Sequence, residues 1–523
     1  MAENSISKLQ NKVTVLENKI ISLQDIVAVR KEKYFLLKKK FEYLEKNFEK
    51  ATKKAVSKAT ESLSLENEKL KIENEKLRKM LNLDSNNSGI PTSKTPIGKK
   101  KRIANLREKS NKSIGGQIGH SKNKLTKFND EEITDNYYHE INKCICGGKL
   151  DIVGNRTKDE FDIEVRVKKI RHYFMEYKCQ KCNKLINVPI PKELKEENQY
   201  GNNVKAIAIS LINEGCVSYN RTRNLIRGFS NNELDISEGY LVKLQKQCSD
   251  KLNSFMNDLK VKIINQKKLN WDDTVITING KNACLRFYGT QNLAYYVAHE
   301  KKNKETLDND GILNNLSKET VVIHDHNTVN YNKDYEFTNA ECCVHLLRDL
   351  KSLNENLNRD WLNEMINFLT ETNKKRNEYM NKDIEHFEDE FIDFCMEEYD
   401  RIIMFAKETN KKDFNKYYGS DEKTLINRLV KYKENYLMWI MRFDIDFSNN
   451  LSERSLRSSK TKMKVSGQFK NLENARYYSN IKSYIETCKR NDINEHEAII
   501  RLFEDNPVSI KEIFEPQKKE SLN

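Results

Sequence analysis

Residues 270–280, NWDDTVITING, decide the fold, because a β-branched run there ends in the pair Asn279-Gly280. An Asn-Gly pair between such runs is a strong signal for a two-residue hairpin turn. The next runs, KNACLRFYGT and AYYVAHE, complete a predicted meander of three strands. The first strand also carries an acidic residue, Asp272. The sequence therefore predicts a sheet with a carboxylate on its first strand.

Two further carboxylates follow on a second strand and a distant helix. In TVVIHDHNTVNY, residues 320–331, an apolar run predicts a buried strand that ends at Asp325. In NNLSERSLR, residues 449–457, Glu453 lies on a predicted helix. With Asp272 they offer oxygen ligands, which suit Mg²⁺ or Mn²⁺, and a pair of such ions can hold both reacting oxygens of a phosphodiester. The alternative is three ordinary exposed carboxylates among the 78 acidic residues.

Composition narrows the kind of protein. A chain of 523 residues is too long for one hydrophobic core, so three or more units are expected. Its formal net charge of +14 favours a polyanionic partner. No apolar run approaches the roughly 18 residues of a membrane span, and the start lacks a secretory pattern, so the cytoplasm is the expected location. Eleven cysteines then indicate thiols or metal ligands rather than disulfides.

The N-terminal region has the pattern of a coiled coil. Between residues 6 and 55, apolar side chains recur at alternating spacings of three and four, which is typical of a core seam. A second stretch, residues 63–81, restarts in a shifted phase, so a stutter or break is expected near Lys58. Asn67 and Asn74 at core positions favour two helices in register. We predict dimerisation; the alternative is a long amphipathic helix that folds back on its own domain.

A basic linker follows the coiled coil. Apolar periodicity stops, and Gly, Pro, Ser and Lys dominate, so this segment is not expected to fold alone. Its charge suits contacts with phosphate, and the paired glycines of GGQIGH allow close approach of the backbone to DNA. The alternative is a solvated spacer. The residues predicted to contact DNA are Lys99, Lys100, Lys101, Arg102, Gly115, Gly116, Gln117 and His120.

Four cysteines beyond the linker predict a small zinc-binding ribbon. The second pair has the two-residue spacing of a zinc knuckle, whereas one residue separates the first pair. Alternation over residues 161–177 predicts strands between the pairs. The alternative is reduced thiols without metal. The predicted ligands are Cys144, Cys146, Cys179 and Cys182, with His139 as a substitute for one thiolate of the first pair.

Two stretches are predicted to be helical. Residues 200–252 contain three short helical patterns, with Gly215 ending the first and Ser237 capping the third. This spacing is compatible with a helix-turn-helix module that binds DNA, and equally with three packed helices that have no such role. Residues 348–438, between the second and third acids, are charged and helix-patterned, which indicates a helical insertion.

Taken in order, these motifs resemble the transposases of the insertion-sequence-66 family. From about Asn86 onward, NNSGIPTSK, GGQIGH, CGGKL and the second cysteine pair each have a counterpart there. WDDTVITINGK is similar to the strand that carries the family's first catalytic acid, and VVIHDHNTVNY to the segment with the second. CCVHLLRDL resembles the Cys-x-x-His element that follows, and NNLSERSLR is the most specific match.

The resemblance implies roles for individual residues. Asp272, Asp325 and Glu453 would be the catalytic acids of an RNase H-like DDE core that uses two Mg²⁺ or Mn²⁺ ions. His345 would be a proton shuttle or DNA contact, or else a core imidazole bonded to backbone. Asn450 would orient the substrate or help to hold Glu453, and two arginines would contact phosphate. The implied supporting residues are Asp273, Cys342, His345, Arg348, Asn449, Asn450, Arg454 and Arg457.

The expected protein is therefore a multidomain α+β transposase of a bacterial insertion sequence. It would bind the element's ends as a homodimer or larger assembly, near the nucleoid and with possible accessory proteins. It would then cleave DNA and transfer the strand. The alternatives are an inactive DNA-binding descendant of a transposase and a nuclease without strand transfer.

The expected units are a coiled coil (1–83), a basic linker (84–128), a zinc ribbon with structural Zn²⁺ (129–195), a helical segment (196–262), the first part of the RNase H-like α/β core (263–347), a helical insertion (348–438), and the rest of that core with C-terminal helices (439–523).

Overall fold

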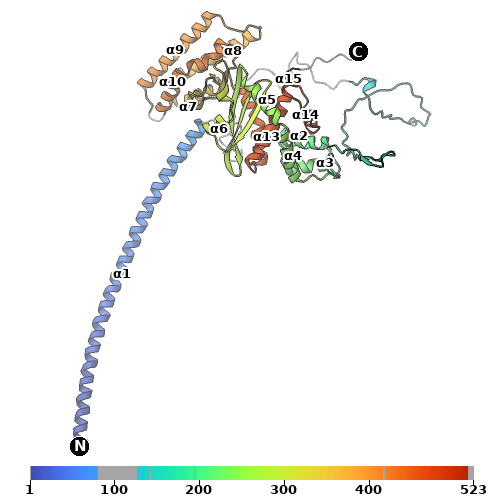
Figure 1. Ribbon diagram of the computed structural model, residues 1–523. Coiled ribbons are helices and arrows are strands. Elements are labelled where there is room, and N and C mark those ends of the chain that lie inside the picture. The colour runs from blue at the N-terminus through green and yellow to red at the C-terminus, as the bar shows by residue number, and fades with distance from the viewer. Residues whose placement is uncertain are drawn as a thin grey trace. The chain divides into compact units, whose positions relative to one another are not determined.

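The computed structural model describes residues 2–80, 127–141, 143–191, 194, 196–415 and 418–515 (Figure 1). It divides into two compact units, Met1–Asn82 and Leu83–Asn523, and each is described by itself. Part of the basic linker lies outside the described residues. The predicted DNA contacts there are Lys99, Lys100, Lys101, Arg102, Gly115, Gly116, Gln117 and His120.

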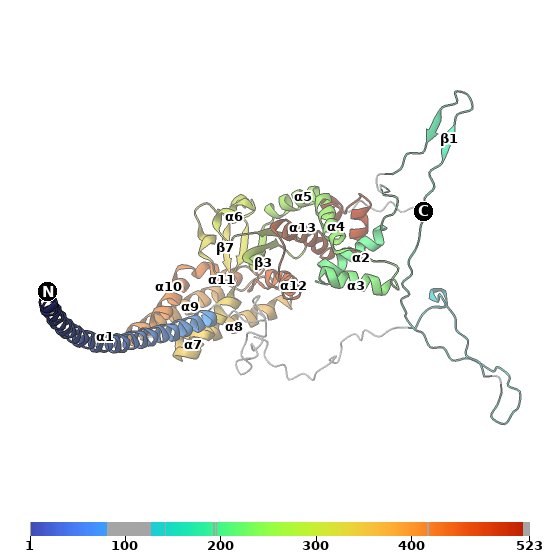
Figure 2. The ribbon, with the colours of Figure 1, turned by 90° about the horizontal axis from the view of Figure 1, so that it is seen from below.

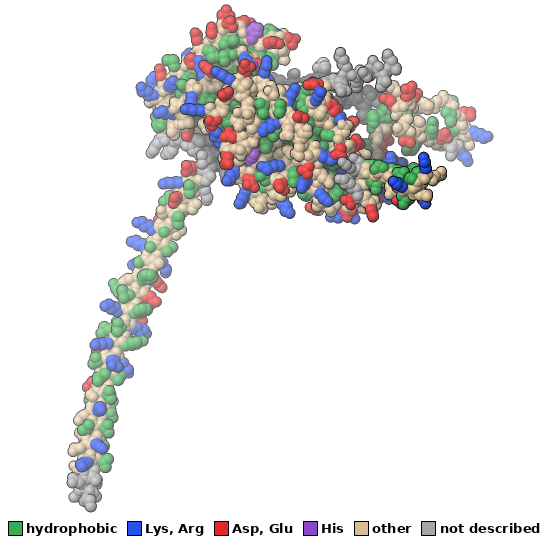
Figure 3. All heavy atoms as spheres, in the orientation of Figure 1, with side chains coloured by type: hydrophobic (Ala, Val, Ile, Leu, Met, Phe, Trp, Pro, Cys, Tyr) green, Lys and Arg blue, Asp and Glu red, His purple; other side chains and the backbone are tan. Residues whose placement is uncertain are grey.

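The first unit is one helix, α1 (Ala2–Met80), of 79 residues. The helix continues through Lys58, so of the two possibilities expected there the break is wrong, and the stutter stays a prediction. Every α1 side chain whose burial is described is exposed, including large apolar ones such as Leu16 and Phe41. Figure 3 shows these apolar side chains at intervals along the surface of α1. The apolar side chains of the predicted seam are therefore exposed, and the coiled coil stays a prediction.

The cysteine segment, residues 127–200, contains little regular structure among its described residues. Within its described part, a 3₁₀ turn (Asp130–Glu132) precedes a hairpin of β1 (Glu176–Lys178) and β2 (Leu185–Asn187), visible in Figure 2. Of the strands predicted over residues 161–177, only the last two residues fall in a strand, so that prediction is largely wrong. Most side chains of the segment are exposed, and a two-stranded hairpin without a hydrophobic partner is marginally stable.

The second unit is built on a five-stranded mixed sheet. The predicted meander is confirmed as β3 (Lys268–Ile278), β4 (Lys281–Gly289) and β5 (Ala294–His299), paired antiparallel. Asn279 and Gly280 both have positive φ, 47° and 73°, as a type I′ hairpin turn requires. The predicted buried strand is confirmed as β6 (Val321–His324).

The sheet order is β5-β4-β3-β6-β7, which makes β3 the central strand. β6 pairs parallel with β3, and β7 (Thr338–Glu341) pairs parallel with β6. The sequence TNAE of β7 has no apolar run, which explains why this strand has no signal in the sequence. β6 pairs with the first three residues of β3, so Asp325, which follows β6, lies level with Asp272 in the middle of β3.

Helices cover the sheet in three hydrophobic clusters. The predicted short helices are confirmed as α2 (Asn202–Asn213), α3 (Tyr219–Phe229) and α4 (Glu238–Lys251), and Ser237 caps α4 by accepting from Tyr240 N at 3.1 Å. With α5 (Asn253–Ile264), α14 (Glu495–Phe503) and α15 (Ile510–Phe514), α2 to α4 contribute to the first cluster. These helices pack into a shared core. Such packing is compatible both with a helix-turn-helix module and with three packed helices that have no DNA role.

The predicted insertion is helical, as expected. It begins with α7 (Cys343–Leu357), and its apolar residues pack on Val321, Ile323 and Ala340 of β6 and β7. The insertion therefore shares a core with one end of the sheet. Its other helices are α8 (Asp360–Met380), α9 (Asp389–Lys412), α10 (Gly419–Lys431) and α11 (Lys433–Met441).

Two C-terminal helices pack against the other end of the sheet. α12 (Asn450–Ser466) contacts β3 and β4, and α13 (Leu472–Lys489) contacts β5 (Figure 2). Backbone N–H groups of Ala294 and Tyr296 on β5 donate to Thr487 Oγ1 and Ser483 Oγ of α13, at 3.2 and 2.8 Å. The edge of the sheet is thereby covered, which prevents pairing with a foreign strand.

Candidate active site

Asp272 and Asp325 come from neighbouring parallel strands. Asn270 of β3 pairs with Ile323 of β6, and each acid lies two residues beyond that pair. Burial raises the pKa of Asp272 well above its usual value, and the charges of Asp325 and Asp273 raise it further. The pKa of one carboxyl responds to the other, so the two predicted acids share one site.

Glu453 enters from the first turn of α12, and Asn449 fixes that turn. The fully buried Asn449 is the N-cap residue, whose carbonyl oxygen accepts from Glu453 N at 3.2 Å. Its side-chain Nδ2 donates to Trp271 O at 2.9 Å, and its Oδ1 accepts from Asn270 Nδ2 at 3.1 Å. Asn449 therefore joins α12 to the strand of Asp272, while Asn450 is exposed.

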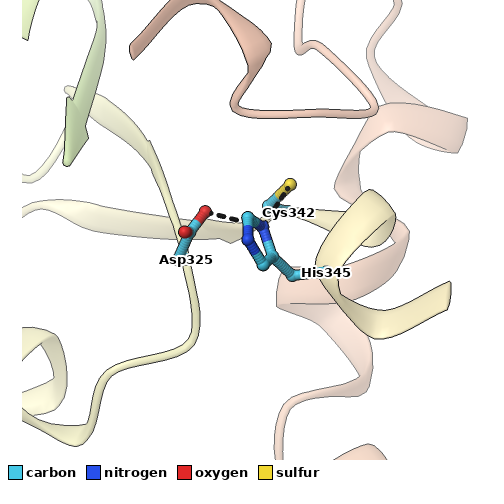
Figure 4. Close-up of side chains that lie close together, drawn as sticks. All are labelled: Asp325, Cys342 and His345. Atoms are coloured by element: carbon cyan, nitrogen blue, oxygen red, sulfur yellow. Dashed lines mark hydrogen bonds and ion pairs between the residues drawn. The ribbon is translucent and has the colours of Figure 1, made fainter. Parts of the chain in front are cut away.

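His345 contacts both of the other predicted acids. Its Nδ1 lies 3.0 Å from Asp325 Oδ1 and 3.4 Å from Cys342 Sγ (Figure 4). Its Nε2 lies 3.7 Å from Glu453 Oε1. The ring nitrogens therefore face carboxylates and sulfur, so the reading of a core imidazole bonded to backbone is wrong.

Arg348 completes this face of α7. Its Nη1 lies 3.0 Å from His345 Nε2 and 3.6 Å from Glu453 Oε1. Cys342, His345 and Arg348 are spaced by three residues, which puts them on one face of the helix. The Cys-x-x-His element is thus a local pattern that one helix turn brings to the acids.

Charge is balanced inside the site. Burial disfavours the imidazolium of His345, but contacts with Asp325 and Cys342 outweigh it and raise its pKa to about 11. Burial also opposes ionisation of Asp325, but His345 outweighs it and lowers the pKa of that carboxyl. Contact between the two groups therefore favours the charged form of each.

Two carboxylate oxygens in the site lack a hydrogen bond. Asp325 Oδ1 and Glu453 Oε1 are both buried and accept none, although His345 and Arg348 lie at ion-pair distance. Buried oxygens of this kind fit a hard divalent cation, which prefers carboxylate ligands. In the described part of the chain, one set of three or more metal-type ligand atoms lies within 4.8 Å of one another: Asp325, Cys342 and His345. No ligand atom of Asp272 or Glu453 belongs to this set.

The four predicted zinc ligands form two separate pairs. Within each pair the thiols interact, and backbone groups of the same turn lower the pKa of Cys146 and of Cys179. Gly147 has a positive φ of 86°, as the tight turn after Cys146 requires. The pairs do not meet in one cluster, and the exposed His139 joins neither. The zinc site stays a prediction.

Two histidines beside Asp325 have no counterpart in the sequence prediction. His324 Nε2 lies 2.7 Å from Asn339 Oδ1, and His326 Nδ1 lies 2.7 Å from Glu341 Oε1. Both partners belong to β7, so the residues on either side of Asp325 are tied to the next strand. The pattern His-Asp-His and the alternating polar residues of TNAE are the signals that could have indicated this.

Comparison with known proteins identifies the family. The family model described as transposase IS66 family matches residues 198–477, more than half of the chain. The chain belongs to the IS66 family of transposases. The matched region contains Asp272, Asp325 and Glu453 with the helix and strands that carry them, and it implies DNA as the partner. No curated protein matches the chain in sequence. No helix in the described residues is long and apolar enough to cross a membrane.

Proposed function

We propose that this chain is a DDE transposase of a bacterial insertion sequence, with Asp272, Asp325 and Glu453 as its metal-binding catalytic acids. It would cleave DNA at the element's ends and join the freed 3′-hydroxyl to target DNA. The observation that carries the proposal is the meeting of Asp325 and Glu453 at His345, with Asp272 on the adjacent strand. The central strand, the adjacent strand end and the crossing helix are the positions expected for an RNase H-like core.

The donor set fits the implied metals. Two buried carboxylate oxygens without hydrogen bonds, Asp325 Oδ1 and Glu453 Oε1, are available to Mg²⁺ or Mn²⁺. Two such ions would lower the barrier by activating the attacking oxygen and stabilising the leaving one. Burial raises the pKa of Asp272, and a bound cation would act against that by favouring the ionised carboxylate.

The chain's own residues would position and neutralise the acids. His345 Nδ1 lies 3.0 Å from Asp325, and both His345 and Arg348 lie near Glu453, so the two side chains hold the carboxylates in place. Asp273 Oδ1 lies 2.6 Å from Lys302 Nζ, so the ion-pair partner of this carboxylate is Lys302. We assign His345 and Arg348 to positioning the carboxylates.

DNA would follow α12 away from the acids. Arg454, Arg457 and Lys464 lie three and seven residues apart, on one exposed face of the helix. The sequence has no acidic residue between Glu453 and Glu473. At 1.5 Å per residue this basic stripe extends roughly 15 Å, about four phosphates of one strand. Neither arginine forms an ion pair within the described residues. Phosphates flanking the cleaved bond are the proposed ligands.

Assembly would come from α1. Its exposed apolar side chains have the spacing of a coiled-coil seam, and Asn67 and Asn74 favour two helices in register. A dimer would bring two transposon ends together. Sedimentation of the full chain should report a dimer, and a chain without residues 1–82 should be monomeric.

Purified protein incubated with DNA of the element's own ends tests the function. We expect nicking that requires Mg²⁺ or Mn²⁺ and, after it, products in which the freed 3′-hydroxyl is joined to a second duplex. Nicking without joining would favour the alternative of a nuclease. Binding without either reaction, in the presence of both metals, would favour the inactive DNA-binding protein.

A further inference from the structure

Asp325, Cys342 and His345 offer the three donor types that zinc takes in proteins: carboxylate oxygen, thiolate sulfur and imidazole nitrogen. One ligand atom from each lies within 4.8 Å of the others. The two contacts of His345 Nδ1, 3.0 Å to Asp325 Oδ1 and 3.4 Å to Cys342 Sγ, can be compared with a tetrahedral site. Ligands about 2.0–2.3 Å from zinc lie about 3.3–3.6 Å from one another. The spacing is therefore already close to that of a zinc site, and Figure 4 shows the three side chains together.

The surroundings of these atoms also fit a metal. Asp325 Oδ1 is buried and accepts no hydrogen bond, and the Asn449 N–H donates to Cys342 Sγ at 3.2 Å. His345 Nε2, which would remain free, lies 3.7 Å from Glu453 Oε1, the kind of histidine–carboxylate pairing found around zinc. Arg348, now 3.0 Å from the same nitrogen, would have to turn away, and its side chain is 28% exposed.

We propose that Asp325, Cys342 and His345 bind a zinc ion, and that zinc bound there blocks the metal chemistry of the acids. Thiolate and imidazole select zinc over Mg²⁺, whereas Asp325 serves either metal. Zinc would take the neutral imidazole of His345 and the thiolate of Cys342 as ligands, and water would take the fourth position. The blocking effect rests on the proposed function; the binding of zinc does not.

Zinc binding is testable without DNA, with Co²⁺ as the probe. The full-length chain carrying Cys144→Ser, Cys146→Ser, Cys179→Ser and Cys182→Ser removes the other predicted thiolate site. In that chain Co²⁺ should give a thiolate charge-transfer absorption, which Zn²⁺ abolishes by displacement. Adding Cys342→Ser should remove the band. Adding Cys343→Ser is the matched control and should keep it, because Cys343 Sγ instead lies 3.2 Å from Tyr436 O.

The variant His345→Gln provides a second test in case the chain with Cys342→Ser does not fold. In the natural chain, His345→Gln should lower the zinc bound at saturation by one ion per chain, or weaken that ion's Kd at least about 100-fold. A band that survives Cys342→Ser, or unchanged zinc content in folded His345→Gln, would overturn the site. So would the absence of any band in the folded four-serine chain.

The blocking effect separates this inference from the proposed function. In cleavage assays the zinc concentration that inhibits should rise with the Mg²⁺ concentration, as competition for Asp325 requires. A chain that binds Co²⁺ through Cys342 but cleaves no DNA contradicts the proposed function alone. A chain that cleaves DNA while Cys342→Ser leaves the Co²⁺ spectrum unchanged contradicts the zinc site alone.

Discussion

The candidate active site and the cysteine segment were both predicted from short sequence motifs. In the first the predicted side chains meet, whereas in the second the two cysteine pairs stay separate. Cys342, His345 and Arg348 lie at the start of α7, which packs on the sheet. They meet Asp325, which follows β6, and Glu453 on α12. Cys144, Cys146, Cys179 and Cys182 form two turns, each well made within itself, in an exposed segment. Local spacing thus determines local geometry, whereas convergence of distant residues requires a hydrophobic core, or a metal in its place.

Neutral isosteres of the acids should have the largest effect. Asp272→Asn, Asp325→Asn and Glu453→Gln each remove a metal-binding charge, so cleavage should fall at least about 1000-fold, roughly 4 kcal/mol in barrier. DNA binding, measured by anisotropy, should change little, because the basic stripe is intact. Asp413→Asn, on the distant helical insertion, is the control. If a variant retains cleavage, the substituted acid is not one of the catalytic acids.

Loss of the second cysteine pair should affect the cysteine segment and leave the sheet unchanged. Cys179→Ser with Cys182→Ser should weaken zinc binding by the segment at least about 100-fold, because two thiolate ligands are removed. Hydrogen exchange should then quicken over residues 129–191 and stay unchanged in the sheet. Unchanged exchange in the segment on zinc removal would contradict the metal as its organising element.

The neighbouring residues Asn449 and Asn450 should differ in their effect on stability. Asn449→Ala leaves Trp271 O and Asn270 Nδ2 without their partner, so the free energy of unfolding should fall by about 2–3 kcal/mol, and cleavage should fall with it. Asn450→Ala removes an exposed side chain and should change stability by less than about 0.5 kcal/mol. Equal effects on denaturant midpoints would mean that Asn449 does not hold α12.

The basic stripe should act on DNA affinity alone. Arg454→Ala with Arg457→Ala should weaken DNA binding roughly tenfold at moderate salt and reduce the salt slope by about 0.9 for each phosphate that the variant no longer binds. Lys407→Ala, an exposed change on α9, should leave both unaltered. A slope that stays the same in the double variant would place the DNA elsewhere.

The smallest effect concerns pH. His345 has a raised pKa, so its contribution to stability is fully present below its unfolded value of 6.5 and is lost as the pH rises toward about 11. The lowered pKa of Asp325 makes that residue's contribution present above its unfolded value of 3.8 and lost in acid. The difference in unfolding free energy between wild type and His345→Gln should therefore be largest between about pH 4 and 6.5. A difference that grows above pH 7 would contradict the ion pair.

Much of the core could be predicted from the sequence. The pair Asn279-Gly280, the run that ends at Asp325 and the cap at Ser237 are local signals, and each forms as predicted. The family resemblance predicted Cys342, His345 and Arg348 as a group, and the structure places them beside the acids.

Other features depend on contacts that sequence spacing does not encode. β7 is polar and short, so its pairing with β6 and its hold on His324 and His326 become visible only in three dimensions. The role of Asn449 rather than Asn450 depends on which side of α12 faces β3. The strands predicted over residues 161–177 alternate correctly but have no apolar surface to pack on.

Anomalous scattering from crystals soaked with Mn²⁺ would show whether the three acids hold two divalent ions. We expect two Mn²⁺ peaks about 3.5–4 Å apart, coordinated by Asp272, Asp325 and Glu453 together. Peaks that involve none of these carboxylates, or a single ion that leaves Asp272 and Glu453 uncoordinated in the presence of DNA, would contradict it.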